Sequence, residues 1–192
     1  MHATTTLPQR RLAGDLAIWF FILAELLAFG VFFAAYAFAR ARHAAEFDVA
    51  QQALNRDAGA LNTLLLLSAS ALVVRAVQGA QAGQGRRAAP WLLGAIVCGL
   101  GFVGVKLGEY AGAFAAGVSL SSSVFHMFYL SLTFFHFMHV LLGLVILAVL
   151  WAGLLAGRYG PDNLNGLESG AAYWHMVDLV WLILFPLVYV IH

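Results

Sequence analysis

Residues Leu16–Phe38 read LAIWFFILAELLAFGVFFAAYAF, a stretch that is apolar apart from one acid, Glu25. An α-helix rises 1.5 Å per residue, so about 20 apolar residues cross the roughly 30 Å of hydrocarbon in a bilayer. The apolar core of a secretory signal peptide is shorter, at about 7–15 residues. The stretch therefore predicts a membrane-spanning helix that is retained in the mature protein.

The composition of the whole chain agrees with a membrane protein. The 192 residues are 62% hydrophobic and only 10% charged, and the mean hydropathy is +0.86. Soluble domains carry about 25% charged residues. The net charge of +1 gives no reason to expect nucleic acid as a partner. The single cysteine, Cys98, excludes an internal disulfide and a cysteine-based metal cluster.

Four further segments are long and apolar enough to span the membrane. Gly14-Asp15 and Ser121–Ser123 suit helix starts, because Asp and Ser side chains cap the first turn. Residues Gly157–Gly166, GRYGPDNLNG, form a turn-rich break, and Pro90 fits a first helical turn. We expect one all-α domain over residues 1–192, a bundle of five transmembrane helices at about 14–40, 59–78, 89–110, 123–156 and 168–191.

Arginines in the loops predict the orientation, because cytoplasmic loops of membrane proteins carry an excess of Lys and Arg. We expect the N-terminus inside and the C-terminus outside, because this orientation puts the larger number of arginines on the cytoplasmic side. The inner set is Arg10, Arg11, Arg75, Arg86, Arg87 and Arg158, and the outer set is Arg40, Arg42 and Arg56.

Glu25 lies about ten residues into the first span, or roughly 15 Å deep. No Lys or Arg is within one helical turn of it. Ionisable groups at membrane depth are costly and usually face protein or water. Two interpretations remain open: a structural carboxyl bonded to a neighbouring helix, and a carboxyl that is proton-active or in contact with lipid.

Histidines are concentrated in the fourth span. His136 and His139 are three residues apart and share a helix face, so they could be two ligands of a metal. His126 lies near the same face but about 15 Å away along the axis, so it cannot complete one site with both. Because a third ligand is missing, hydrogen-bonded packing histidines are the favoured interpretation, and we expect no metal.

Two more pairs with a spacing of three lie at membrane depth. His175 and Asp178 interrupt the fifth span, and the carboxylate could accept a hydrogen bond from the imidazole. Lys106 and Glu109 have the same spacing in the third span, where a salt bridge is the simple explanation. We expect both to be structural polar pairs.

Glycines recur at a spacing that permits close helix contacts. Gly104, Gly108 and Gly112 are each four residues apart, and small residues at this spacing let helix backbones approach each other. We assign these three, together with Gly143, to helix packing. The glycine faces would also allow association with a second copy of the chain.

Five stretches, in order along the chain, resemble the subunit III family of haem-copper oxidases. In that comparison Glu25 falls on the membrane carboxylate of the family. The last stretch matches the closing motif of Trp-His, Val-Asp and Trp. The stretches are FFILAELLAFGVFF around Glu25, LNTLLLLSAS at Leu61–Ser70, KLGEY at Lys106–Tyr110, TFFHFMHVLLG at Thr133–Gly143 and ESGAAYWHMVDLVWL at Glu168–Leu182.

The resemblance implies a non-catalytic, multi-pass subunit in a bacterial inner membrane that packs against a haem-copper catalytic subunit. It implies that haem and copper lie in that partner, that phospholipid binds, and that Glu25, His136 and His139 are linked to lipid or protons. Larger family members have two more N-terminal helices, which form one wall of a lipid cleft. GFVGVKLGEY, ESGAAYWHMVDLVWLILFPLVYVIH and LNTLLLL look closest to the five-helix accessory protein of bacterial nitric oxide reductase.

Two other functions stay open on the residues alone. A small proton channel or transporter would use Glu25, Lys106, Glu109 and Asp178, the charged groups at membrane depth. A membrane metalloenzyme would use His126, His136, His139 and His175 on a metal or haem. The family resemblance favours neither of these two functions, because the subunit that it implies has no independent catalytic activity.

Overall fold

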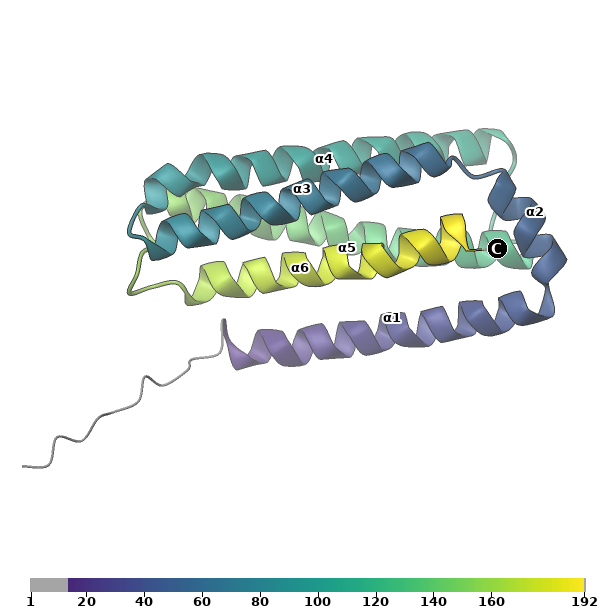
Figure 1. The fold of residues 1–192 in the computed structure, drawn as a ribbon, viewed down its shortest axis with the longest axis horizontal. Coiled ribbons are helices and arrows are strands. Elements are labelled where there is room, and N and C mark those ends of the chain that lie inside the picture. Colours follow the sequence, from purple (N-terminus) through teal and green to yellow (C-terminus); the bar gives the residue numbers. More distant parts are fainter. Residues whose placement is uncertain (1–13, 192) are drawn as a thin grey trace, which may run out of the picture.

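The structure is a computed structural model that describes residues 14–191, so Arg10 and Arg11 of the predicted inner set lie outside the described residues. Within residues 14–191 the chain forms six α-helices and a short π-helical turn, without a β-strand. Five of the helices are long and apolar enough to cross a membrane, which confirms the predicted all-α fold with five spans (Figure 1). The elements are α1 (Leu16–Arg42), α2 (Ala44–Gln52), α3 (Arg56–Gln81), α4 (Gly85–Ala115), α5 (Val124–Leu155), α6 (Asn165–Phe185) and η1 (Pro186–Val190).

Three of the long helices begin at a polar cap. The side chains of Asp15, Asn55 and Ser123 accept hydrogen bonds from backbone N–H groups in the first turns of α1, α3 and α5, respectively. Such a bond satisfies a donor that has no partner within the helix. At the end of α5, Gly157 adopts a φ of 69°, which a residue with a Cβ rarely adopts. The turn-rich break predicted at 157–166 begins there.

Several helices extend beyond their predicted bounds. α3 begins at Arg56 instead of 59, and α4 runs from Gly85 to Ala115 instead of 89–110. Pro90 consequently lies in the second turn of α4 and not in the first. Hydropathy detects the part of a helix that lies in hydrocarbon, whereas polar turns at both ends continue the helix towards water.

The helix α2 was missed by the sequence analysis. It has nine residues, AAEFDVAQQ, and is too short and polar for a span. Its one large apolar side chain, Phe47, is fully buried against Tyr36, with ring centroids 5.3 Å apart. The Gln51 amide donates to the backbone oxygen of Val188 at 2.9 Å. The helix therefore ties the end of α1 to the C-terminal turn of the bundle.

The last span changes its helix type at Pro186. α6 ends at Phe185, and η1 follows with a backbone bond from Ile191 N–H to the Pro186 oxygen at 2.9 Å. Proline removes a backbone donor and crowds the preceding turn, which favours a local widening of the helix. Tyr189 in this turn points back into the bundle and is fully buried. The change of helix type at Pro186 thus positions a buried tyrosine.

Four of the spans form a packed bundle, and α1 lies along one side of it. α3 and α4 form a hairpin in which a Cβ at Gly79 would meet the Cβ of Ala88 at 2.8 Å. α1 runs beside α6 and away from the α3–α4 hairpin (Figure 1). We call the end of the bundle at which α1 begins the proximal end, and the end with α2 and η1 the distal end.

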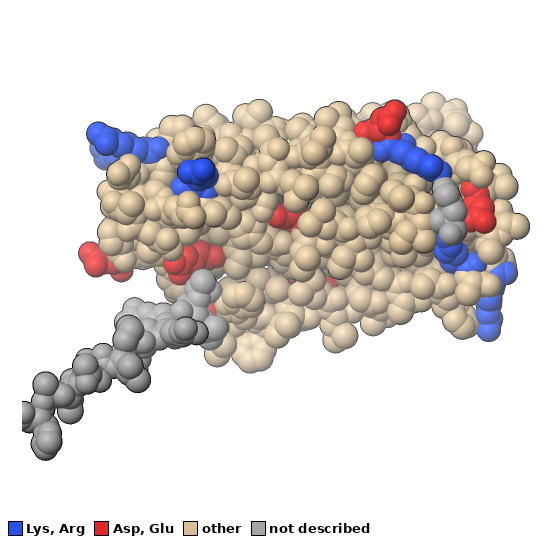
Figure 2. Space-filling model, in the orientation of Figure 1, with Lys and Arg blue, Asp and Glu red and all other residues tan. Residues whose placement is uncertain are grey.

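The surface has charged ends and an apolar middle. Most Lys and Arg atoms lie at the two ends, and the middle is uncharged apart from small acidic patches (Figure 2). Large apolar side chains such as Leu27, Val31 and Val145 are more than half exposed. In water such a belt would be unfavourable, whereas lipid chains cover it without cost. The predicted inside position of the N-terminus stays a prediction.

Candidate functional site

The carboxyl of Glu25 meets a histidine from the fourth span. Glu25 Oε2 lies 3.1 Å from His139 Nε2, and this contact joins α1 to α5. The other ring nitrogen of His139, Nδ1, lies 2.7 Å from the backbone oxygen of Phe135. Tyr173 donates to the His139 backbone oxygen at 3.2 Å. The side chain of Glu25 is 21% exposed and that of His139 is 11% exposed, so the pair lies at the edge of the bundle.

The two contacts of His139 determine how many protons the pair holds. A carbonyl oxygen only accepts hydrogen bonds, so Nδ1 carries a hydrogen and donates it to Phe135. The bond between Nε2 and Glu25 then needs one more proton, carried either by the carboxyl or by the imidazole. In both forms the pair has no net charge and holds one proton between its partners. This arrangement can keep a proton at membrane depth without leaving an unpaired charge.

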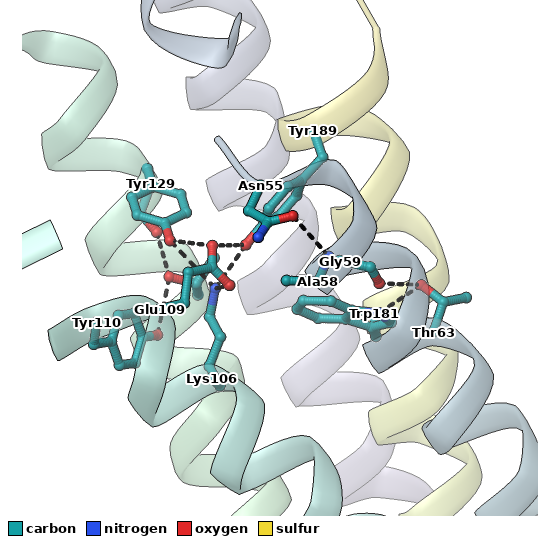
Figure 3. Close-up of polar contacts among 11 residues, drawn as sticks. Asn55, Ala58, Gly59, Thr63, Lys106, Glu109, Tyr110, Tyr129, Trp181 and Tyr189 are labelled. Atoms are coloured by element: carbon teal, nitrogen blue, oxygen red, sulfur yellow. Dashed lines mark hydrogen bonds and ion pairs between the residues drawn. The ribbon is translucent and has the colours of Figure 1, made fainter. Parts of the chain in front are cut away.

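A second polar cluster surrounds Lys106, which is fully buried (Figure 3). Its Nζ donates to Glu109 Oε2 at 3.2 Å and to the Tyr189 hydroxyl at 2.7 Å. Glu109 Oε1 accepts from the hydroxyls of Tyr129 at 2.5 Å and Tyr189 at 2.6 Å. Both carboxylate oxygens and the ammonium therefore have partners, which a buried ion pair requires.

Aromatic rings complete the surroundings of the ammonium. The Nζ atom lies 5.0 Å from the ring centroids of Tyr110 and Tyr129, 5.4 Å from that of Tyr189 and 5.8 Å from that of Trp181. A cation within about 6 Å of a ring face is attracted by the ring quadrupole. The cluster brings together side chains from α4, α5, α6 and η1 near the distal end of the bundle.

The contact between His175 and Asp178 differs from the expected self-contained pair. His175 Nδ1 is 3.5 Å from Asp178 Oδ2, at the limit of a hydrogen bond. The same nitrogen is 2.7 Å from the hydroxyl of Ser70 on α3. The stronger contact of His175 is therefore with a neighbouring helix. The spacing within α6 could not reveal it, because Ser70 lies far away along the chain.

His136 takes no part in the Glu25 contact, although it shares a helix face with His139. It is fully buried, and its ring centroid lies 5.2 Å from Trp181 and 5.7 Å from Phe102. Neither ring nitrogen has a hydrogen-bond partner within residues 14–191. His136 and His139 thus lie in different surroundings, although their spacing and the family resemblance predict one common role for them.

The histidines do not meet at a common point. His126 lies near the start of α5, where its Nδ1 is 2.8 Å from the Ser123 hydroxyl. Across the described part of the chain, no three His, Cys, Asp or Glu side chains lie close enough to hold a metal ion. The charged groups at membrane depth likewise fall into three separate contacts, Glu25–His139, Lys106–Glu109 and His175–Asp178.

The glycines assigned to packing divide into two kinds. A Cβ at Gly143 would lie 2.9 Å from the Trp174 ring, so this glycine makes room for an indole between α5 and α6. At Gly104, Gly108 and Gly112 a Cβ would meet no atom of the described chain within 4 Å. The expected packing of these three is therefore not found between helices of this chain. All three are exposed, and Gly108 and Gly112 line a cavity at the distal end together with Ala58 of α3.

Grooves between the helices reach two of the polar clusters. One cavity of about 550 Å³ lies among α1, α3 and α6, and a second of about 530 Å³ lies at the distal end. We call them the α1–α3–α6 groove and the distal groove. The first is lined by Trp19, Leu26, Val77, Gln78, His175 and Leu179, among others, and the second by Leu54, Asn55, Gly108, Glu109, His126 and Tyr129, among others.

Several residues of these clusters had not been singled out from the sequence. They are Ser70, Tyr129 and Tyr189, which reach the clusters from other elements. Tyr189 carries one usable signal, because it follows Pro186 within an apolar span. Ser70 is a small polar residue in a long helix, and its partner depends on how the helices pack.

The fold and the polar contacts define a class: a polytopic membrane protein whose acidic side chains at membrane depth contact a lysine or a histidine within the bundle. Comparisons with known proteins identify the family within this class. Residues 9–192 match the family described as cytochrome c oxidase subunit III. The chain belongs to the cytochrome c oxidase subunit III family, whose members are non-catalytic membrane subunits of haem-copper oxidases.

Individual relatives agree with the family match. Cytochrome c oxidase subunit 3 of Thermostichus vulcanus is 31% identical over 185 residues, which cover 96% of this chain and 89% of that protein. The subunit 3 of Arabidopsis thaliana is 35% identical over 129 residues, 67% of this chain and 48% of that protein. The chain thus matches about half the length of this plant relative. A protein of Aeropyrum pernix named heme-copper oxidase subunit I+III is 29% identical over 181 residues, 91% of this chain and 22% of that protein.

Proposed function

We propose that this chain is a non-catalytic subunit that packs against a haem-copper catalytic subunit in a bacterial cytoplasmic membrane. The observation that carries the proposal is the Aeropyrum pernix relative, whose name assigns subunits I and III to one protein. A fusion of this kind is favourable when the two parts already work side by side. The haem and copper of the complex then belong to the partner.

Within that complex we propose that Glu25 and His139 support proton uptake by the neighbouring subunit. The two side chains hold one proton between them, 3.1 Å apart, at the edge of the bundle. A pair without net charge can stay at membrane depth at low cost, and it can pass its proton on when a stronger acceptor comes near. His136 lies in other surroundings and is not part of this proposed role.

We also propose that phospholipid occupies the α1–α3–α6 groove. Its lining is mainly apolar, with Gln78, Gln81 and Glu168 towards the proximal end, where lipid headgroups would lie. An acyl chain in the groove would cover the apolar sides of α1 and α3, which do not pack against each other. This lipid would also hold α1 in its place beside α6.

The partner is tested by purifying the tagged full-length chain from its own membranes in a mild detergent. We expect the haem-copper catalytic subunit to be recovered with it, visible by its haem absorption and by mass spectrometry. Gly104→Leu tests whether the exposed surface of α4 around residue 104 contacts that subunit, and the variant should lower the recovery of haem. Recovery of the wild-type chain free of any haem protein would contradict the proposal.

The identity of the partner can be read from the same preparation. The sequence motifs favour the nitric oxide reductase branch, and the relatives named here are subunits of oxygen-reducing cytochrome c oxidases. We propose that the purified complex reduces one of these two gases. Consumption of nitric oxide without oxygen consumption would assign the chain to the accessory branch, and the reverse result would assign it to the oxidases.

Glu25→Gln tests the proton role in the intact complex. Glutamine keeps the hydrogen-bonding shape but cannot exchange a proton, so turnover should slow or decay faster than in the wild type. Asp162→Asn is the matched control, because Asp162 is exposed in the α5–α6 loop at the proximal end and lines neither groove. Equal turnover and equal lipid content in the Glu25→Gln and control complexes would leave Glu25 only a packing role.

A further inference from the structure

Buried polar atoms without a protein partner gather in the middle of the bundle. Asn62 and His136 are fully buried, and Asp178 is 6% exposed. Both polar side-chain atoms of Asn62, both ring nitrogens of His136 and Oδ1 of Asp178 have no hydrogen-bond partner within the described residues. The indole nitrogen of Trp174 is also without a partner there, and the carbon atoms of this ring pack against Gly99 of α4 and Gly143 of α5.

Each of the three residues is related to one aromatic side chain, Trp181, by a contact or by its place beside a residue in contact with it or one turn away. The His136 ring is 5.2 Å from the Trp181 ring, and Asp178 precedes Trp181 by one turn of α6. Thr63, next to Asn62 in the chain, accepts the Trp181 indole N–H at 3.0 Å (Figure 3). His136 is about 18 Å from the start of α5, deep within its span, and Asn62 is about 9 Å from the start of α3, nearer to the distal end.

Leaving these atoms without partners would be unfavourable. Each unsatisfied buried polar group costs about 1–3 kcal/mol, and an entire domain is usually stable by only about 5–15 kcal/mol. The surrounding hydrocarbon supplies no donor or acceptor. Several such groups therefore need partners that are small enough to fit between packed helices and that both donate and accept. Water meets these requirements.

The polar clusters on either side give the waters further neighbours. Towards the distal end, Lys106 Nζ lies 5.8 Å from the Trp181 ring, and its partner Glu109 lines the distal groove. On the α3 side, Asp178 Oδ2 contacts His175, which lines the α1–α3–α6 groove. The unpartnered atoms thus lie between two hydrogen-bonded clusters, and each cluster reaches a groove on the surface.

We propose that ordered water molecules bind at the centre of the bundle to Asn62, His136 and Asp178. These waters join the Lys106–Glu109 cluster to the His175–Ser70 contact and make one continuous polar network. His136 is then a water ligand, which explains why a histidine is kept at this depth without a protein partner. The site does not depend on the proposed catalytic partner, because all of its ligands come from this chain.

The direct test is solid-state NMR of the full chain in hydrated lipid bilayers, with nitrogen-15 in the histidine rings. Magnetisation transferred from water should reach the ring nitrogens of His136, whose signal is assigned by its loss in His136→Phe. His126 is the positive control, because it is partly exposed and lines the distal groove. Transfer to His126 without transfer to His136 would overturn the proposal.

A second variant tests the ligand set. Asn62→Leu keeps a similar volume but removes both polar atoms, so the water transfer to His136 should fall at least about twofold. The thermal stability should also fall, since the remaining ligands lose a shared partner. If the site were dry, Asn62→Leu would remove an unsatisfied amide and raise the melting temperature, and that result would also overturn the proposal.

Discussion

At the scale of single residues, Lys106 shows how a full charge is kept inside a membrane bundle. The side chain has no exposed surface, yet its ammonium has a carboxylate, hydroxyls and aromatic rings around it. The partners differ in their distance along the chain. Glu109 is three residues away and could be predicted from the spacing, whereas Tyr129 and Tyr189 come from other elements. The sequence therefore identified the ion pair but not the site that contains it.

Lys106→Met should destabilise the protein strongly. The substitution leaves the Glu109 carboxylate buried without its cation, and breaking one partner of a buried pair costs about 3–5 kcal/mol. The measurement is thermal or denaturant unfolding of the purified chain in detergent. The double variant Lys106→Met, Glu109→Gln should recover part of the loss, because no unpaired charge remains. A single variant as stable as the wild type would contradict the role assigned to the pair.

Ser70→Ala tests which partner of His175 matters more. The hydroxyl of Ser70 lies 2.7 Å from His175 Nδ1, and Asp178 lies 3.5 Å from the same atom. Loss of the shorter bond should cost about 1 kcal/mol in the free energy of unfolding. Ser68→Ala is the matched control, because Ser68 is exposed on the same helix. Equal stability of the two variants would mean that the contact between α3 and α6 does not depend on this bond.

At the scale of elements, α4 has faces that a sequence pattern cannot tell apart. Gly79 of α3 and Ala88 of α4 lie in close contact, and Gly99 of α4 makes room for the Trp174 ring, whose atom Cη2 would lie 3.0 Å from an added Cβ. At Gly104, Gly108 and Gly112 an added Cβ would meet open space, and Gly108 and Gly112 line the distal groove. A spacing of four locates a smooth helix face, but it does not state which helix covers that face. That information lies in the three-dimensional packing or in the partner.

Gly143→Ala should lower stability, whereas Gly108→Ala should not. A Cβ at residue 143 would lie 2.9 Å from the Trp174 ring, and the indole is held between helices. Overpacking of this kind costs about 1–3 kcal/mol. A Cβ at residue 108 meets open space, and Ala is preferred over Gly within a helix by about 0.5–1 kcal/mol. Unfolding of both purified variants measures the difference in stability. A Gly108→Ala chain that is less stable than the wild type would contradict the open space at residue 108.

At the scale of the whole molecule, the fold was largely predictable and the neighbours of each helix were not. Five long apolar runs with polar breaks determine the number of spans, because a lipid environment permits only helices for such segments. The position of α1 beside α6 depends instead on individual contacts, such as Asp15 N–H to the Ser169 hydroxyl at 3.0 Å. Contacts between residues this far apart leave no periodic signal.

The orientation of the whole molecule can be tested by labelling cysteines from one side of the membrane. In a Cys98→Ala background, Gln52→Cys lies in exposed α2 at the distal end, and Asp162→Cys lies in the exposed α5–α6 loop at the proximal end. The excess of arginines predicts that an impermeant maleimide added to intact cells labels residue 52 and not residue 162. The opposite pattern would reverse the predicted topology.

The position of α1 has a consequence for how the protein is made. α1 leaves the ribosome before α5, and His139, the partner of its Glu25 carboxyl, follows 114 residues later. At about 5–20 residues per second, Glu25 waits roughly 6 to 23 s for this partner. During that interval the carboxyl lies in lipid or in the insertion machinery without its imidazole. A delay in synthesis between α1 and α5 would therefore lengthen the exposure of this intermediate to membrane quality control.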